Sequence, residues 1–325
     1  MVRRDLGLIR AACIVNTSDL VAGTTPPLGA SDDVRAGRRT PGALVRSLRA
    51  SAPVLPFLIY VFLGLGIPTL VIINLAFRTK AGHLTLSNIQ TITSGGQYLA
   101  GFETSLKLAL VTSVIPGILG TVLAYAISTS RHESVKRIIA SASGVLANFG
   151  GVNLAFMFVA SFGAVGLVTS WLARVGLNPW DHGFSLYKFW GVALVYMYFQ
   201  VPLMVLVVTP ALHGLRPAWR EAAENLGAST WYYWRYVGIP VIMPSVLGSM
   251  FLLFGFGFSA YATTEALTGG SIALTPIQIG AFLNGNVLAG HENIGYALGF
   301  GMIVLLLISV LGYVFLQRRS SRWLQ

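Results

Sequence analysis

The sequence is poor in charged residues and contains a single cysteine. Lys, Arg, Asp and Glu make up 10% of its 325 residues, against about 25% in a typical soluble protein. This deficit excludes an ordinary soluble domain and a disordered chain. The lone cysteine, Cys13, excludes a disulfide framework and a cysteine metal cluster. The five histidines form no pair at metal-ligand spacing and no recognisable catalytic triad, so we expect no metal site and no catalytic residues.

Apolar residues and glycine are abundant instead. Hydrophobic residues make up 54% of the chain, and its 36 glycines are of the kind that lets membrane helices pack closely. The net charge of +11 would suggest nucleic-acid binding in a soluble protein. Here most basic residues lie in a few clusters between long uncharged runs, a pattern typical of membrane topology. The sequence therefore predicts a protein that contacts membrane lipid and binds no nucleic acid.

Six apolar runs are long enough to cross a bilayer, which takes about 20 helical residues. Asn148 and Asn153 interrupt the third run and make it the weakest. An uncharged stretch over 266–291 is rich in Gly, Thr and Asn, and we interpret it as an external or re-entrant loop. The predicted fold is all-α, with six transmembrane helices over 53–77, 108–128, 138–162, 189–215, 237–264 and 293–317.

The basic residues also predict the orientation of these helices. Most of the 22 Lys and Arg residues lie on the side that holds both termini, and this excess favours the cytoplasm for that side. Residues 1–50 are rich in Arg, Gly and Ser, and Arg10 interrupts the apolar core that a secretory signal would need. We therefore expect a cytoplasmic, disordered tail over 1–50 and a transmembrane domain over 51–325.

The loop after the fourth predicted span, over about 213–240, has the signals of a helical hairpin. Pro217 suits the first turn of a helix. Glu221 and Glu224 are expected early in that helix, where carboxylates complement the helix dipole. Gly227 is expected to end it, and a second short amphipathic segment then runs to Pro240. A short charged hairpin on the cytoplasmic face of a membrane protein is a docking element for a partner.

This loop resembles the EAA loop of permeases from binding-protein-dependent ABC importers. Glu221-Ala222-Ala223, Gly227, Val237 and Ile239-Pro240 stand at the spacing of that motif, with Val237 and Ile239 as conservative departures. The resemblance extends over about residues 51–325 and implies the type I importer permease fold. It also implies a coupling helix that fits a groove of an ATPase subunit. The residues it assigns to this contact are Glu221, Ala222, Ala223, Gly227, Ala228 and Pro240.

The resemblance further implies the partners and the location of the chain. It implies a multi-pass protein of the cytoplasmic (inner) membrane that works with a second permease subunit, two ATPases and an extracytoplasmic substrate-binding protein. We favour two different permease chains. None of the lysines follows a glycine, so the phosphate-binding loop of an ATPase is absent from the sequence. We therefore expect no cofactor in this chain and expect the partner ATPase to bind and hydrolyse ATP with Mg.

The substrate is predicted from the last external loop. Glu265-Ala266-Leu267-Thr268-Gly269-Gly270 and residues 277–283 resemble the spermidine/putrescine branch, although ferric-iron and aminophosphonate permeases read similarly there. Glu265 is expected near the external end of the fifth span, where a carboxylate beside aromatic rings could receive a cation. The candidate residues of the substrate pathway are Glu265, Tyr261, Asn148 and Asn153.

Two other classes of protein stay open on the sequence alone. A gradient-driven secondary transporter would need intramembrane ionisable residues for ion coupling, and these are scarce. A membrane enzyme would need a catalytic constellation, which the histidines do not supply.

Overall fold

The structure is a computed structural model that describes residues 54–79, 81–94, 96–285 and 292–321. The chain divides into two units, Met1–Tyr60 and Val61–Gln325. Of the first unit, only residues 54–60 are described, and they form most of helix α2 (Leu55–Val61). The cytoplasmic tail expected over residues 1–50 lies outside the described residues.

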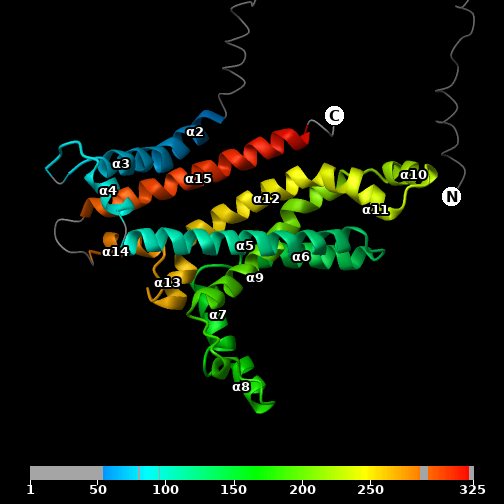
Figure 1. The fold of residues 1–325 in the computed structure, drawn as a ribbon, viewed down its shortest axis with the longest axis horizontal. Helices are drawn as coiled ribbons and strands as arrows, with labels where there is room; N and C mark the ends of the chain where they lie inside the picture. The colour runs from blue at the N-terminus through cyan, green and yellow to red at the C-terminus, as the bar shows by residue number, and fades with distance from the viewer. Residues whose placement is uncertain (1–53, 80, 95, 286–291, 322–325) are drawn as a thin grey trace, which may run out of the picture. The chain divides into compact units, whose positions relative to one another are not determined.

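Within the described residues, every regular element is a helix, and one isolated bridge pairs Arg78 with Leu84 (Figure 1). After α2 the elements are η3 (Phe62–Gly66), α3 (Ile67–Ala76), α4 (Ser87–Thr93), α5 (Gln97–Ser128), α6 (Glu133–Asn148), α7 (Val152–Phe162), α8 (Leu167–Arg174), η4 (Pro179–His182), α9 (Phe189–His213), α10 (Pro217–Asn225), α11 (Thr230–Tyr233), η5 (Trp234–Gly238), α12 (Ile239–Ser259), α13 (Ala262–Thr268), α14 (Thr275–Leu283) and α15 (Glu292–Ser321).

Six helical stretches in the described residues are long and apolar enough to cross a membrane, which confirms the predicted all-α class and number of spans. The second stretch begins at Gln97, well before the predicted start at residue 108. The segment interpreted as a loop over 266–291 contains the end of α13 and the short helix α14, and residues 286–291 lie outside the described part. The six stretches are Leu55–Ala76, Gln97–Ser128, Val152–Arg174, Phe189–His213, Thr230–Ser259 and Asn293–Arg318.

The third span differs from the prediction, which was wrong in treating 138–162 as one helix. α6 ends at Asn148, and α7 starts a new helix at Val152. Gly151 between them has φ 76°, a left-handed conformation that glycine adopts without steric cost. Its N–H donates to Oγ1 of Thr263 over 2.9 Å. The break is therefore held by a residue more than a hundred positions away, which no hydropathy window can register.

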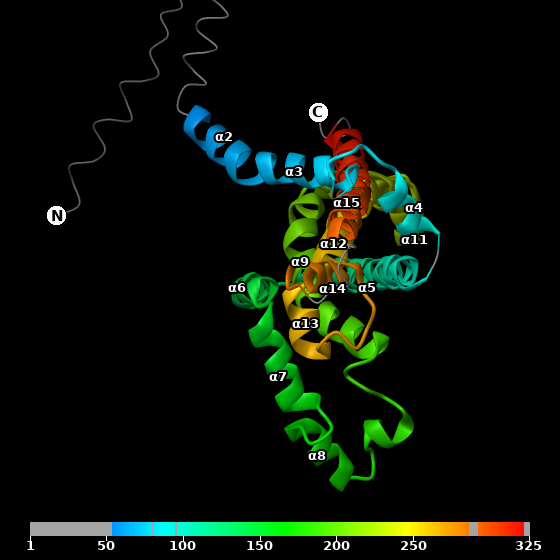
Figure 2. The same ribbon diagram turned by 90° about the vertical axis from the view of Figure 1, so that its left-hand side faces the viewer.

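α5, α9 and α12 pack together at the centre of the second unit (Figures 1 and 2). Small and polar residues meet where they cross. A Cβ added to Gly257 of α12 would lie 2.8 Å from Oγ1 of Thr112 and 3.0 Å from Nε2 of Gln200. Thr112 and Gln200 are both fully buried. Glycine at this position therefore allows the close approach of the three helices.

α12 connects the two ends of this unit (Figure 1). At one end it continues from α10, α11 and η5, and at the other it leads into α13 and α14. With 1.5 Å of rise per residue, its 21 residues span about 30 Å. A displacement at the α10–α11 end can therefore reach the α13–α14 end through one helix.

Candidate functional site

The predicted hairpin is present between α9 and α12. α10 begins at Pro217, which stands at the first helical position after the extended residue Arg216, as the sequence predicts. None of the residues of α10 is buried. The helix therefore lies at the surface of the chain, with Trp219 and Ala223 half-buried.

The carboxylates of α10 do not lie where the sequence predicts them. The first turn holds no acidic residue, because Glu221 is in the middle of the helix and Glu224 is close to its C-terminal end. A carboxylate there opposes the helix dipole, and Glu224 instead accepts a hydrogen bond from Nε of Arg220 over 2.9 Å. That hydrogen bond and the charge of Glu224 raise the pKa of Arg220. The side chain of Glu221 is exposed.

Gly227 ends α10 as predicted, through a defined turn. Its φ is 77°, its N–H donates to the carbonyl of Glu224 over 2.9 Å, and the N–H of Ala228 donates to the carbonyl of Ala223 over 2.9 Å. These two bonds are those of the Schellman motif, which closes a helix with glycine in the left-handed conformation. The turn therefore fixes Ala223 and Ala228 to each other and sets the direction of α11.

The second half of the hairpin leads directly into α12. The hydroxyl of Ser229 caps α11 by accepting from the N–H of Tyr232 over 3.4 Å. η5 follows as one π-helical turn and runs into Pro240 at the start of α12. Trp234 packs edge-on against Tyr125 of α5, with ring centroids 4.9 Å apart. The hairpin is therefore anchored to α5 as well as to α12.

The outer face of the hairpin exposes apolar side chains. Leu226 is 87% exposed and Trp231 is 67% exposed. Glu221 and Ala222 are also exposed, whereas Ala223 and Ala228 are half-buried. An exposed mixture of apolar and charged groups on a rigid turn is suited to contact with another protein.

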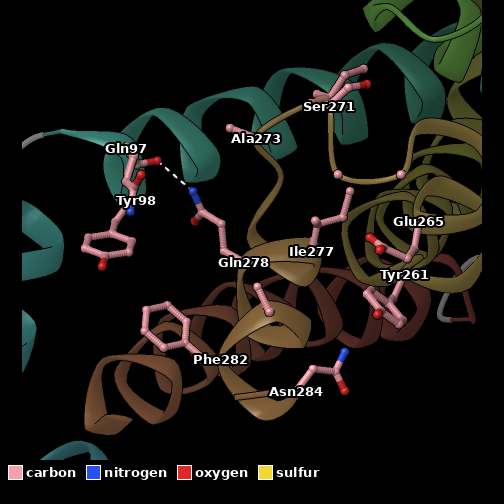
Figure 3. A pocket seen from close by; sticks show the side chains of 14 residues that line it. Gln97, Tyr98, Tyr261, Glu265, Ser271, Ala273, Ile277, Gln278, Phe282 and Asn284 are labelled. Carbon is pink, nitrogen blue, oxygen red and sulfur yellow. Dashed lines mark hydrogen bonds between the residues drawn. The ribbon is translucent and has the colours of Figure 1, made fainter. Parts of the chain in front are cut away.

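At the opposite end of α12, a cavity of about 570 Å³ lies between α5, α13 and α14 (Figure 3). Glu265 and Tyr261, two of the predicted pathway residues, both line it. The full lining consists of Gln97, Tyr98, Tyr261, Glu265, Gly269, Gly270, Ser271, Ile272, Ala273, Ile277, Gln278, Ala281, Phe282 and Asn284.

The other two predicted pathway residues do not line this cavity. Asn148 is exposed, and its Nδ2 donates to the carbonyl of Gly144 in its own helix over 2.8 Å. Asn153 is exposed at the start of α7. Both flank the break at residues 149–151, which is tied to α13 through Thr263, two residues before Glu265.

Sequence reasoning missed several polar residues of the cavity. Nε2 of Gln278 donates to the carbonyl of Gln97 over 2.7 Å, a contact between residues 181 positions apart. Gln278 lies in the segment whose resemblance to polyamine-type permeases drew attention to this loop. Nothing in the spacing of Gln97, Tyr98 or Asn284 indicates that they meet it.

Comparisons with known proteins agree on one family. The family model for the binding-protein-dependent transport system inner membrane component matches residues 49–322. The sulfate transport system permease protein CysT of Escherichia coli is 23% identical over 197 residues, which cover 60% of this chain and 68% of that protein. The spermidine/putrescine transport system permease protein PotC homolog of Mycoplasma genitalium is 24% identical over 268 residues, covering 79% and 86%. The trehalose transport system permease protein SugB of Mycobacterium tuberculosis is 24% identical over 263 residues, covering 78% and 88%.

Solved structures show the same fold. A chain of a bacterial ABC transporter involved in the import of the acidic polysaccharide alginate superposes with a TM-score of 0.64 at 17% identity. The match covers 86% of this chain and 98% of that one. A chain of a bacterial alginate ABC transporter in complex with an alginate pentasaccharide-bound periplasmic protein gives a TM-score of 0.63 at 18% identity, and the match covers 87% of this chain and 98% of that one.

Proposed function

Because this chain belongs to the family of binding-protein-dependent ABC importer permeases, which are inner membrane proteins, we propose that its α10–α11 hairpin is the surface that binds a separate ATPase. The family membership confirms the resemblance seen in the loop over 213–240. The observation that carries the proposal is the hairpin itself, an exposed, glycine-closed turn joined without interruption to a membrane-spanning helix.

The contact residues of the proposed ATPase surface are those of the motif. Glu221 and Ala222 are exposed on α10, Gly227 sets the turn, and Pro240 starts α12. Ala223 and Ala228 are half-buried and joined by a backbone hydrogen bond, so they shape the surface from within. In this proposal the partner ATPase binds ATP and Mg and hydrolyses the ATP, and this chain transmits the resulting motion through α12.

The complete importer is proposed to contain a second, different permease chain, two ATPases and an extracytoplasmic binding protein. Closure of the ATPases would push on the hairpin and tilt the spans, which would open the pathway outward to receive substrate. Family membership argues against the gradient-driven transporter and the membrane enzyme, because this family transports with binding proteins.

The pathway of this importer is proposed to include Glu265 and Tyr261 in the cavity and Asn148 and Asn153 at the break between α6 and α7. This break lies just before the third membrane-capable stretch, which begins at Val152. The two asparagines are exposed there, so they suit a position facing the second permease or the pathway.

Polyamine is the substrate that we propose, with ferric iron, aminophosphonate or another small solute as the alternative. The names of the relatives differ in substrate, since they include sulfate, spermidine/putrescine, trehalose and thiamine. One feature supports polyamine. Glu265 supplies a carboxylate in the cavity.

The test is affinity purification of the solubilised chain, followed by mass spectrometry of the proteins that accompany it. An ATPase, a second permease and a binding protein are expected. A charge-reversing variant, Glu221→Lys, should lose the ATPase but keep the second permease. Glu133→Lys is the control, since Glu133 is an exposed carboxylate on another helix. If Glu221→Lys retains the ATPase at the wild-type ratio, the hairpin is not the binding surface.

A further inference from the structure

The cavity between α5, α13 and α14 contains acceptor oxygens that lack a donor. Oε2 of Glu265 is buried and has no hydrogen-bond partner, and the same holds for Oε1 of Gln278. The amide nitrogen of Gln278 is already engaged, because it donates to the carbonyl of Gln97 over 2.7 Å. A buried acceptor without a donor destabilises the folded protein. Both oxygens belong to residues that line one cavity, so a ligand with N–H groups would supply the missing donor once these side chains turn toward it.

The charge of the lining has one sign. Among the fourteen described residues that line the cavity, Glu265 is acidic and none is Lys, Arg or His. Gln97, Gln278 and Asn284 add amide groups without charge. An anion such as sulfate would therefore meet a carboxylate and no basic side chain.

The walls also present aromatic rings. Tyr98 and Phe282 stand on one side with ring centroids 5.9 Å apart, and Tyr261 stands beside Glu265 on the other (Figure 3). Aromatic faces attract cations. A carboxylate at one side and rings at both sides suit an elongated ligand with positive charge.

Two glycines set this geometry by close approach. A Cβ on Gly101 would lie 2.5 Å from Oε1 of Gln278, and a Cβ on Gly280 would lie 2.7 Å from the ring of Tyr261. The amide of Gln278 therefore packs directly against the backbone of Gly101, and the ring of Tyr261 packs directly against the backbone of Gly280. The volume of about 570 Å³ is within the usual range for small-molecule sites, about 300–1,000 Å³.

From these observations we infer that the cavity is a binding site for an organic cation with several N–H donors, the chemistry of a primary diamine or polyamine. The inference rests on the proposed importer function and specifies where, and by which groups, the substrate is held. Glu265 supplies the charge, Gln278 and Asn284 accept N–H groups, and Tyr98, Tyr261 and Phe282 contact the positive charge and the methylene chain.

The test measures equilibrium binding of radiolabelled spermidine to the permease–ATPase complex in nanodiscs, without the binding protein. Spermidine is expected to bind saturably, and radiolabelled sulfate is expected not to bind. Choline carries a positive charge but no N–H group, so it should bind more weakly than spermidine. Sulfate binding, or choline binding as tight as that of spermidine, would overturn the inference.

Variants assign the binding to the cavity. The Glu265→Gln variant should bind spermidine about tenfold more weakly or worse, because it loses a hydrogen bond between charged groups. Asn284→Asp adds a second carboxylate and should tighten binding. Glu103→Gln is the matched control, because Glu103 is an exposed carboxylate of α5 that pairs with Lys107 outside the cavity lining. Wild-type affinity in both Glu265→Gln and Asn284→Asp would refute the site.

The same preparation separates this inference from the proposed function. If the loaded binding protein stimulates ATP hydrolysis but spermidine does not bind, the proposed importer function is supported and the proposed cation site is refuted. If no binding protein stimulates hydrolysis and the ATPase does not co-purify, the proposed function itself fails. The Asn284→Asp variant keeps the test decisive if Glu265→Gln does not fold, because it predicts a gain of affinity.

Discussion

The turn at Gly227 gives the sharpest prediction, because the structure isolates one physical cause. Its φ of 77° lies in the left-handed region, and a Cβ added there would meet no atom within 4 Å. The cost of a side chain is therefore conformational and not steric. For a residue with a Cβ this cost is about 1–2 kcal/mol, which lowers the population of the observed turn roughly 5- to 30-fold. Gly227→Val should show the largest loss, and Gly227→Asn the smallest, because asparagine tolerates this conformation.

The assay is ATP-dependent uptake in proteoliposomes, together with stimulation of ATP hydrolysis by the loaded binding protein. Gly227→Val is expected to insert normally but to lose most of both signals. Gly176 provides the control, since it ends α8 with φ 77° and also has no atom within 4 Å of a built Cβ. The turn at Gly176 has the same pair of closing hydrogen bonds. The N–H of Gly176 donates to the carbonyl of Ala173, and the N–H of Leu177 donates to the carbonyl of Leu172. Full coupling in Gly227→Val, or an equal loss in Gly176→Val, would refute the reasoning.

Three further predictions concern the packing and charge of the remaining helices. Gly257→Ala should destabilise the solubilised complex by about 1–3 kcal/mol in thermal unfolding, because the added methyl group would lie 2.8 Å from a threonine hydroxyl of α5. Gly255→Ala is the control and should be close to neutral, because the nearest atom to its added methyl group is 3.7 Å away. Gln200→Leu should not lower the melting temperature. Oε1 of Gln200 is buried without a partner, and an apolar replacement removes that cost, while it loses only the long hydrogen bond of 3.4 Å from Nε2 to the carbonyl of Leu253. The hydrogen bond and charge of Lys136 lower the pKa of Glu133, so this pair stabilises α6 above the ordinary carboxyl pKa and its contribution is lost as pH falls through the lowered value. NMR of the side-chain carboxyl carbon should show that this pKa rises toward its ordinary value in Lys136→Met, while the charge of Arg137 still lowers it.

The two ends of α10 could be predicted because their signals are local. Proline at the first helical position and glycine at the closing turn act within four or five residues of their own place in the chain. The structure places Pro217 and Gly227 in those roles, whereas the cap that Ser229 supplies to α11 was not predicted. The carboxylates were misplaced although both ends of α10 were predicted correctly, because α10 is only nine residues long and Glu224 therefore lies in its last turn.

The cavity could be predicted only in part. Glu265 and Tyr261 stand out in the sequence because a carboxylate next to aromatic and hydroxyl side chains at a span end is unusual. Gln97 and Gln278 do not stand out, since each is an ordinary polar residue in its own segment and their contact joins positions 181 apart. Such pairs depend on how closely the start of α5 approaches α14. The absence of a side chain at Gly101 allows this approach, and no periodic pattern in the sequence indicates it.

The predicted third span shows that hydropathy can locate an apolar segment but cannot tell whether the segment is one continuous helix. Hydropathy sums side chains over a window, and the window over 138–162 is apolar enough to read as one helix. Whether the backbone stays helical depends on where its N–H and C=O groups find partners, because an unpaired group is costly in a bilayer. Here Gly151 finds its acceptor in Thr263 of α13, so the helix can stop at Asn148 without leaving that N–H unpaired. Since the acceptor also stands two residues from Glu265, the same hydrogen bond ties the break between α6 and α7 to the helix that carries the carboxylate of the cavity.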